Sequence, residues 1–171
     1  MDQPEPRTAV VIAEGDAEPL PWARALQAVV DATFCWISTI REPHGPPHTR
    51  PALVVVVDGI LFSTSRPGAV KARNVIAEPV ASVAVRDGDV DVVVEATVRR
   101  VTDVPTLELV AAAYADTYQW PVTIEDDAYL APYGAPTAGD PPYHLFAFTP
   151  VRAYAFGTNE DHAPRSTRWT F

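Results

Sequence analysis

The residues best suited to chemistry lie together between positions 63 and 74, where hydroxyl, amide and basic side chains flank a glycine. The hydroxyl residues are Ser63, Thr64 and Ser65, and Gly68 is followed by Lys71, Arg73 and Asn74. All these side-chain groups donate hydrogen bonds to an anion, and the first turn of a following helix adds unpaired backbone N–H groups. The segment therefore predicts a cradle for an anion, and a phosphate best suits this mixture of donors.

Lys71 supports this hypothesis because it is the only lysine in a chain whose other strongly basic residues are all arginine. Its ammonium is a compact point charge, unlike the planar fork of a guanidinium. The same residues also fit a solvated turn that leads into a helix. From the residues alone, both interpretations stay open.

Length and composition narrow the class of protein. The chain has 171 residues, 47% of them hydrophobic and 20% charged, and its formal net charge is -9. Duplex nucleic acids and anionic membranes are bound through clustered basic side chains, so this charge argues against both as the main partner. Cys35 is the single cysteine, and no stretch has the pattern of a secretory signal or the length of a membrane span. We expect a cytoplasmic protein that binds a small anionic ligand.

Helical spacing of apolar residues predicts a helix over 19–33 and another over 106–120. A short helix is expected after the cradle and should end at Pro79. Residues 1–18 are rich in Pro, Glu and Asp, so we expect a poorly ordered arm there, followed by a single domain over 19–171.

Six segments have the residue types of strands. They are 34–41, 52–57, 60–64, 80–86, 90–101 and 143–157, with Pro150 expected to bend the last. Asp58 and Gly59 predict a hairpin between the second and third of these strands. The regular spacing of strands and turns predicts an antiparallel barrel with added helices. The Pro- and Gly-rich segment 121–142 is expected to be a long loop.

Taken as a set, these motifs resemble the pyridoxamine 5'-phosphate oxidase-like family of flavin and deazaflavin oxidoreductases. The matching residues are Thr39 at the end of a strand, Gly45, Pro47, His48 and Pro51 around the next loop, and Lys71 and Asn74 after the cradle. The strand around Glu95 is also similar to the Val-Glu-Gly-x-Ala strand of that family, with Ala96 in place of the glycine. The resemblance implies a mainly β, α+β fold, a split antiparallel β-barrel of the FMN-binding type with flanking helices.

The resemblance also implies a site. Lys71 and Asn74 would hold the phosphate of FMN or of the deazaflavin coenzyme F420, helped by Ser63, Thr64 and Ser65. Thr39 and the strand residues Arg50, Pro51 and Ala52 would lie along the ring. The family implies a homodimer with two cofactor sites at its interface and hydride transfer to or from a small substrate. Pyridoxamine phosphate is not the expected substrate, because the phosphate-binding residues that it needs near the C-terminus are not evident.

Two further segments are expected to complete the site. Trp169, with Arg168, would cross to the partner subunit and line its cofactor site, and residues 131–142 would cover the substrate side of the ring. Glu42, His44 and His48 are candidate metal ligands, but closed metal sites gather four ligands, so we expect no metal. The other functions considered are a cofactor-carrying or haem-binding protein of the same fold without turnover, and a dimeric structural module with an empty site.

Overall fold

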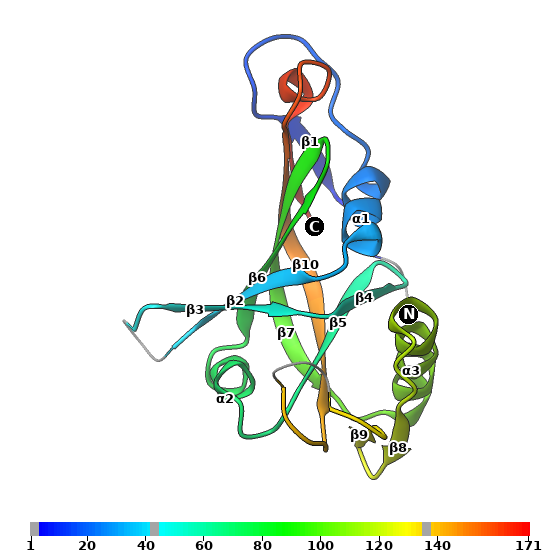
Figure 1. Ribbon diagram of the computed structural model, residues 1–171. Helices are drawn as coiled ribbons and strands as arrows, with labels where there is room; N and C mark the ends of the chain where they lie inside the picture. Colours follow the sequence, from blue (N-terminus) through cyan, green and yellow to red (C-terminus); the bar gives the residue numbers. More distant parts are fainter. Residues whose placement is uncertain (1–3, 42–44, 135–137) are drawn as a thin grey trace.

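One antiparallel sheet of nine strands organises the molecule (Figure 1). Its strands are β1 (Thr8–Val11), β2 (Cys35–Ile40), β3 (Pro47–Ala52), β4 (Val54–Val57), β5 (Ile60–Ser65), β6 (Val80–Asp87), β7 (Val90–Val101), β10 (His144–Gly157) and β11 (Thr167–Thr170). The main path runs β1-β11-β10-β7-β6-β2-β3, and β5 joins β4 to β10. The computed structural model describes residues 4–41, 45–134 and 138–171.

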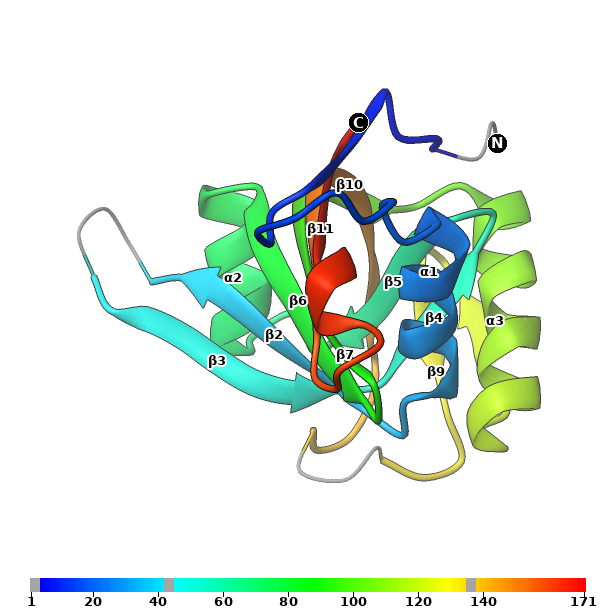
Figure 2. The same ribbon diagram turned by 90° about the horizontal axis from the view of Figure 1, so that it is seen from above.

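Helices lie on both sides of this sheet. They are α1 (Trp22–Asp31), α2 (Val70–Ala77) and α3 (Val104–Tyr118), with a short 3-10 helix, η1 (Ala163–Arg165), before β11. In both views α2 lies across the sheet from α1 and α3 (Figures 1 and 2). The fold is thus mainly antiparallel β with three flanking helices, and the predicted fold class is confirmed. No helix in the described ranges is long and apolar enough to cross a membrane.

β10 connects the parts of the sheet, because it pairs with three other strands. It pairs with β7 along almost its whole length, while its first part also pairs with β5 and its second part with β11. The register with β7 shifts between Pro150 and Arg152, where a bulge bends the strand. Proline has no N–H to donate to a neighbouring strand. It is tolerated at a bulge because the regular pairing is already interrupted there. The bend that Pro150 predicted is confirmed, and it separates the two halves of the sheet.

Two apolar cores fill the molecule. The larger includes residues of α1, of α2 and of the sheet between them, among them Trp22, Ile37, Val94 and Phe148. The smaller lies beneath α3 and includes Phe62 and a group of tyrosines. The first core forms one wall of the candidate site described below, and the second lies behind β5.

The structure contains strands that the sequence did not predict, among them β3 and β11. Part of the expected N-terminal arm forms β1, which pairs with β11 from Thr8 opposite Thr170 to Val11 opposite Thr167. The expected long loop contains a hairpin of β8 (Thr123–Glu125) and β9 (Ala128–Leu130). Both strands of the hairpin are three residues long, so neither produces a periodic pattern long enough to be recognised.

Candidate functional site

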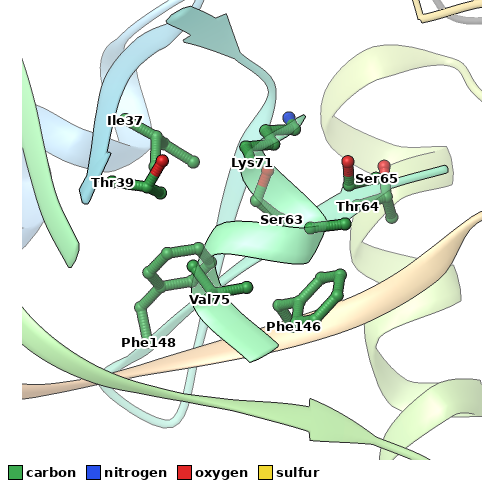
Figure 3. A pocket seen from close by; sticks show the side chains of 10 residues that line it. Ile37, Thr39, Ser63, Thr64, Ser65, Lys71, Val75, Phe146 and Phe148 are labelled. Atoms are coloured by element: carbon green, nitrogen blue, oxygen red, sulfur yellow. The ribbon is translucent and has the colours of Figure 1, made fainter. Parts of the chain in front are cut away.

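A small cavity lies between α2 and strands β2, β5 and β10, and Figure 3 shows the side chains around it. Its walls are formed by Ile37, Thr39, Ser63, Thr64, Ser65, Lys71, Ala72, Val75, Phe146 and Phe148. The structure therefore brings together five of the residues predicted for the site, from positions 39 to 71. The cavity volume is about 10 Å³, which is room for about one water-sized group.

Strand pairing explains why the cavity has polar residues on one side and an apolar floor. β5 and β10 pair with Ser63 opposite Phe146 and Ser65 opposite His144. Side chains of directly opposed residues stand on the same face of a sheet, so the serines and phenylalanines share one surface. α2 crosses this surface and adds Lys71. Phe146 and Phe148 could not be predicted as site residues, because nothing local in the sequence indicates that β10 pairs with β5.

The three consecutive hydroxyls are not equivalent. Ser63 Oγ donates to the Leu53 carbonyl at 2.9 Å, and Thr64 forms a side-chain hydrogen bond with Tyr114. Ser65 is only 5% exposed, and its Oγ has no hydrogen-bond partner among the described residues. An unpaired buried hydroxyl is unfavourable. Ser65 is therefore the hydroxyl that is left to bind a ligand.

Lys71 is half-buried at the edge of the cavity and has no hydrogen-bond or ion-pair partner in the described part of the chain. Burial lowers the pKa of Lys71 from 10.5 to about 8. The helix that carries it begins at Val70 and has no side-chain cap, so its first N–H groups add partial positive charge. Lys71, the N-terminus of α2 and the Ser65 hydroxyl thus lie around one cavity, and the two side chains have no partner among the described residues.

Asn74 follows Lys71 on α2. It is buried and is not among the residues that line the cavity, and its contact with a phosphate stays a prediction. Its Nδ2 donates to Thr39 Oγ1 at 2.8 Å, and Thr39 Oγ1 donates to the His48 carbonyl at 3.4 Å. Asn74 therefore contacts a residue that lines the cavity.

The strand residues predicted to lie along the ring are on β3, outside the cavity. Ala52 is buried in the larger core, and the Arg50 guanidinium donates to the Thr49 carbonyl at 2.7 Å. Arg50 and Pro51 are exposed at the edge of the sheet. Their contact with a cofactor stays a prediction.

Trp169 lies within its own chain and away from the cavity. It is 1% exposed and packs edge-on against Trp22, with ring centroids 5.5 Å apart. Phe171 packs against the same ring at 5.0 Å. The apolar tail is thus docked on α1 of this chain, which corrects the expectation that Trp169 reaches a partner's site, because a ring buried this deeply has no free face.

A larger groove lies beside the cavity, and Thr39 lines both. Its volume is about 480 Å³, and it is lined by Ser38, Thr39, Ile40, Pro47, Val80, Ala81, Ser82, Glu95, Ala96, Thr97, Val151 and Arg152. Glu95 and Arg152 form an ion pair at 3.3 Å within it. A volume of roughly 300 to 1,000 Å³ is usual for a ligand site. The motif residues Thr39 and Pro47 and the strand motif around Glu95 all contribute to the lining of this groove.

His48 is 7% exposed, and its Nδ1 has no partner among the described residues. Burial lowers the pKa of His48, and the charges of Arg50, Arg41 and Lys71 lower it further. Glu42 and His44, the other candidate metal ligands, lie outside the described residues. Within the described ranges, no group of three or more His, Cys, Asp or Glu residues is placed to hold a metal ion.

Known proteins with this fold were then compared with the chain. A conserved hypothetical protein from Mycobacterium tuberculosis superposes with a TM-score of 0.63 at 18% identity, over 85% of this chain and 90% of that one. A pyridoxamine 5'-phosphate oxidase-related, FMN binding protein from Nostoc punctiforme gives a TM-score of 0.52 at 16% identity, over 88% and 89%. A structure named F420 reductase gives 0.53 at 21% identity, over 74% and 93%.

These likenesses show the fold. A search of curated proteins finds no match to the sequence. The family model for pyridoxamine 5'-phosphate oxidase, in contrast, matches residues 22–157. This range includes every residue that lines the cavity and the groove. Since the match spans well over half of the chain, the protein belongs to the pyridoxamine 5'-phosphate oxidase family.

Proposed function

We propose that this protein is an oxidoreductase that uses FMN or coenzyme F420, with the cofactor phosphate bound at Lys71 and Ser65. One observation carries the proposal: a half-buried ammonium and a buried hydroxyl face one small cavity without partners among the described residues. An anion with several oxygens would supply what both groups lack. The cavity admits about one oxygen-sized group, so the rest of the phosphate would lie at its mouth.

The groove is the proposed place for the ring. It is long enough to span β2, β6, β7 and β10, and its walls are largely small or apolar. A ligand with its phosphate at Lys71 and its ring in this groove would pass Thr39, which borders both spaces. The names of two structural relatives, one FMN binding and one an F420 reductase, agree with either cofactor.

Each part of the site has a defined task in this proposal. The bound cofactor supplies hydride transfer. Lys71 and the N-terminus of α2 neutralise the phosphate, Ser65 donates to one of its oxygens, and the groove excludes water from one face of the ring. The substrate is proposed to be small and flat, and different from pyridoxamine phosphate.

A homodimer is part of the proposal, since the outer face of the sheet exposes large apolar side chains. Trp36, Ile40, Val80 and Val151 are each between 41% and 47% exposed, and the last three border the groove. A second copy laid on this face would bury them and cover the ring. Trp36→Glu is expected to shift the molecular mass measured by light scattering from dimer to monomer. A wild-type monomer at micromolar concentration would contradict the proposal.

The first test is titration of the purified protein with FMN and with F420, followed by fluorescence. Micromolar binding of one of them is expected, and Lys71→Met should weaken it by roughly 10- to 100-fold, the equivalent of about 1.5 to 3 kcal/mol for a charged hydrogen bond. Arg86→Met removes the same charge from an exposed position on β6 and should have little effect. If neither cofactor binds, the oxidoreductase proposal fails; if one binds tightly but no acceptor oxidises its reduced form, the protein is a carrier.

A further inference from the structure

We propose that Asn74 is a positioning residue: it makes Thr39 a hydrogen-bond donor to the uncharged chain that joins the cofactor's ring to its phosphate. In this inference Asn74 does not touch the phosphate itself. The inference rests on the proposed function, because it concerns the same ligand in the same site.

The contacts of Asn74 point away from the phosphate. Asn74 follows Lys71 by three positions, so the two side chains lie on neighbouring faces of α2, but only Lys71 lines the cavity. Asn74 is 7% exposed, and its amide nitrogen already donates to Thr39 Oγ1 at 2.8 Å. A buried amide with this short contact has its donor directed at β2.

That contact determines how Thr39 can act. Because Thr39 Oγ1 accepts a hydrogen from Asn74, its own hydrogen points elsewhere. The acceptor found for it among the described residues is the His48 carbonyl at 3.4 Å, beyond the usual range of about 2.5 to 3.0 Å for O–H···O bonds. A ligand oxygen at normal distance would take this hydrogen. The donation from Asn74 also polarises the hydroxyl and strengthens it as a donor.

The position of Thr39 identifies which part of the ligand it meets. Thr39 is 2% exposed and borders both the small cavity and the groove. A ligand with its anion in one and its ring in the other has its linking chain at Thr39. In FMN and in F420 this chain carries hydroxyl groups, whose oxygens accept hydrogen bonds.

The experiment compares ligands with and without the phosphate. Dissociation constants for FMN and for riboflavin are measured on wild type, Asn74→Ala, Thr39→Val and the double variant; F420 and its phosphate-free 8-hydroxy-5-deazaflavin fragment replace them if F420 is the cofactor. Asn74→Ala is expected to weaken both ligands of a pair by the same factor, about five- to tenfold. In the Thr39→Val background, the same substitution should have no further effect.

Two results would overturn the inference. A loss confined to the phosphate-bearing ligand would make Asn74 a direct phosphate ligand, and full additivity with Thr39→Val would show that it does not act through Thr39. The ratio of FMN to riboflavin affinity in wild type and Lys71→Met tests the phosphate site separately. A phosphate site can thus fail while the coupling between Asn74 and Thr39 holds, and the reverse can also occur.

Matched controls separate positioning from loss of structure. Asn159→Ala removes a side-chain amide hydrogen bond of similar length, 2.9 Å to Asp89, together with the contacts of Asn159 Oδ1 to His162. Asn159 lines neither the cavity nor the groove, so this variant should leave both affinities unchanged. Thermal unfolding checks that each variant is folded. If Asn74→Ala does not fold, Thr39→Val is the deciding variant. The inference requires Thr39→Val to weaken the ligand with the phosphate and the ligand without it by the same factor, and an unequal loss would overturn it.

Discussion

Two regions of this molecule bury polar side chains, and they treat them in opposite ways. Beneath α3, the Tyr129 hydroxyl donates to the Leu107 carbonyl at 2.6 Å and the Tyr118 hydroxyl to the Val54 carbonyl at 2.8 Å. Beneath α2, Lys71 and Ser65 have no such partners among the described residues. Unpaired polar groups reduce stability. The bonded hydroxyls under α3 therefore do not reduce the stability of the fold. The unpartnered Lys71 and Ser65 under α2 reduce it, and their hydrogen-bond donors stay available.

The two regions also differ in how their aromatic side chains pack. Under α3, Trp120 packs edge-on against Tyr114 and Tyr143, with both centroid distances 5.4 Å. The polar atoms of these three side chains donate hydrogen bonds to backbone carbonyls. Under α2, the cavity walls combine hydroxyl side chains and Lys71 with the apolar side chains of Ile37, Ala72, Val75, Phe146 and Phe148. The comparison predicts that removing a bonded hydroxyl under α3 lowers stability and leaves ligand binding unchanged, whereas removing an unpartnered group under α2 weakens ligand binding without loss of stability.

The largest expected effect is the loss of ligand-induced stabilisation in Lys71→Met. At a ligand concentration 100 times the dissociation constant, binding stabilises the folded state by about 2.7 kcal/mol. Wild type should show this as a rise in melting temperature with the cofactor that it binds, and Lys71→Met, with its affinity roughly 10- to 100-fold weaker, should show about half of that rise or less at the same concentration. Without ligand, the variant should be at least as stable as wild type, since an unpaired half-buried ammonium is removed. A destabilised apo variant would contradict the comparison.

The pH dependence of binding sharpens the role of the same lysine. Since the pKa of Lys71 is lowered to about 8, cofactor affinity should fall as pH rises from 7 to 9 and the ammonium loses its proton. Without ligand, the free energy of unfolding should change in the opposite direction. The unfolded chain holds this proton up to about pH 10.5, so the lowered pKa of Lys71 favours the folded state as pH rises from about 8 to about 10.5. Titrations at several pH values should show the fall for wild type. Lys71→Arg, which stays charged, should lack it.

The next effect concerns the region under α3. Tyr129→Phe removes the hydroxyl that donates to Leu107 and leaves a buried carbonyl without this bond. The free energy of unfolding in urea should fall by about 1 to 2 kcal/mol, while cofactor affinity stays within twofold of wild type. A change in affinity larger than the change in stability would break the separation of the two regions.

The smallest expected effect is that of Ser65→Ala. The substitution removes an unpartnered buried hydroxyl, so apo stability should be unchanged or slightly raised. Cofactor affinity should fall by about three- to fivefold, because one neutral hydrogen bond to the phosphate is lost. Ser63→Ala is the control at the next position on this face of β5: its hydroxyl already donates to Leu53, so it should lower stability more than affinity.

The sequence placed Ser65 and Lys71 in one predicted site because they are close together in the chain, and the structure brings both to one cavity. Ser65 and Lys71 are separated by one turn, and the strand before it and the helix after it have clear local patterns. Position in a motif did not reveal how a side chain is used: Asn74 shares the motif with Lys71, yet its amide is bonded to Thr39. That distinction depends on how α2 packs on β2, which no local pattern encodes.

The parts that could not be predicted are those made by distant strands. The floor of the cavity comes from β10, and the groove combines residues of β2, β6, β7 and β10. Trp169 was interpreted as a ligand-binding residue because a terminal aromatic looks unpartnered in the sequence. Its partner, Trp22, is almost at the other end of the chain, and only the folded sheet brings the two together.

The pairing of β1 with β11 also determines when the fold can be completed. Thr8 lies opposite Thr170, so the edge of the sheet cannot close, and Trp22 cannot be covered by Trp169, until translation has passed residue 170. The cavity under α2 needs only residues up to Phe148. During synthesis, the walls of the cavity can therefore assemble while the other half of the sheet is still open. Contacts of such long sequence separation form slowly, so the pairing of β1 with β11 is expected to be a late step of folding.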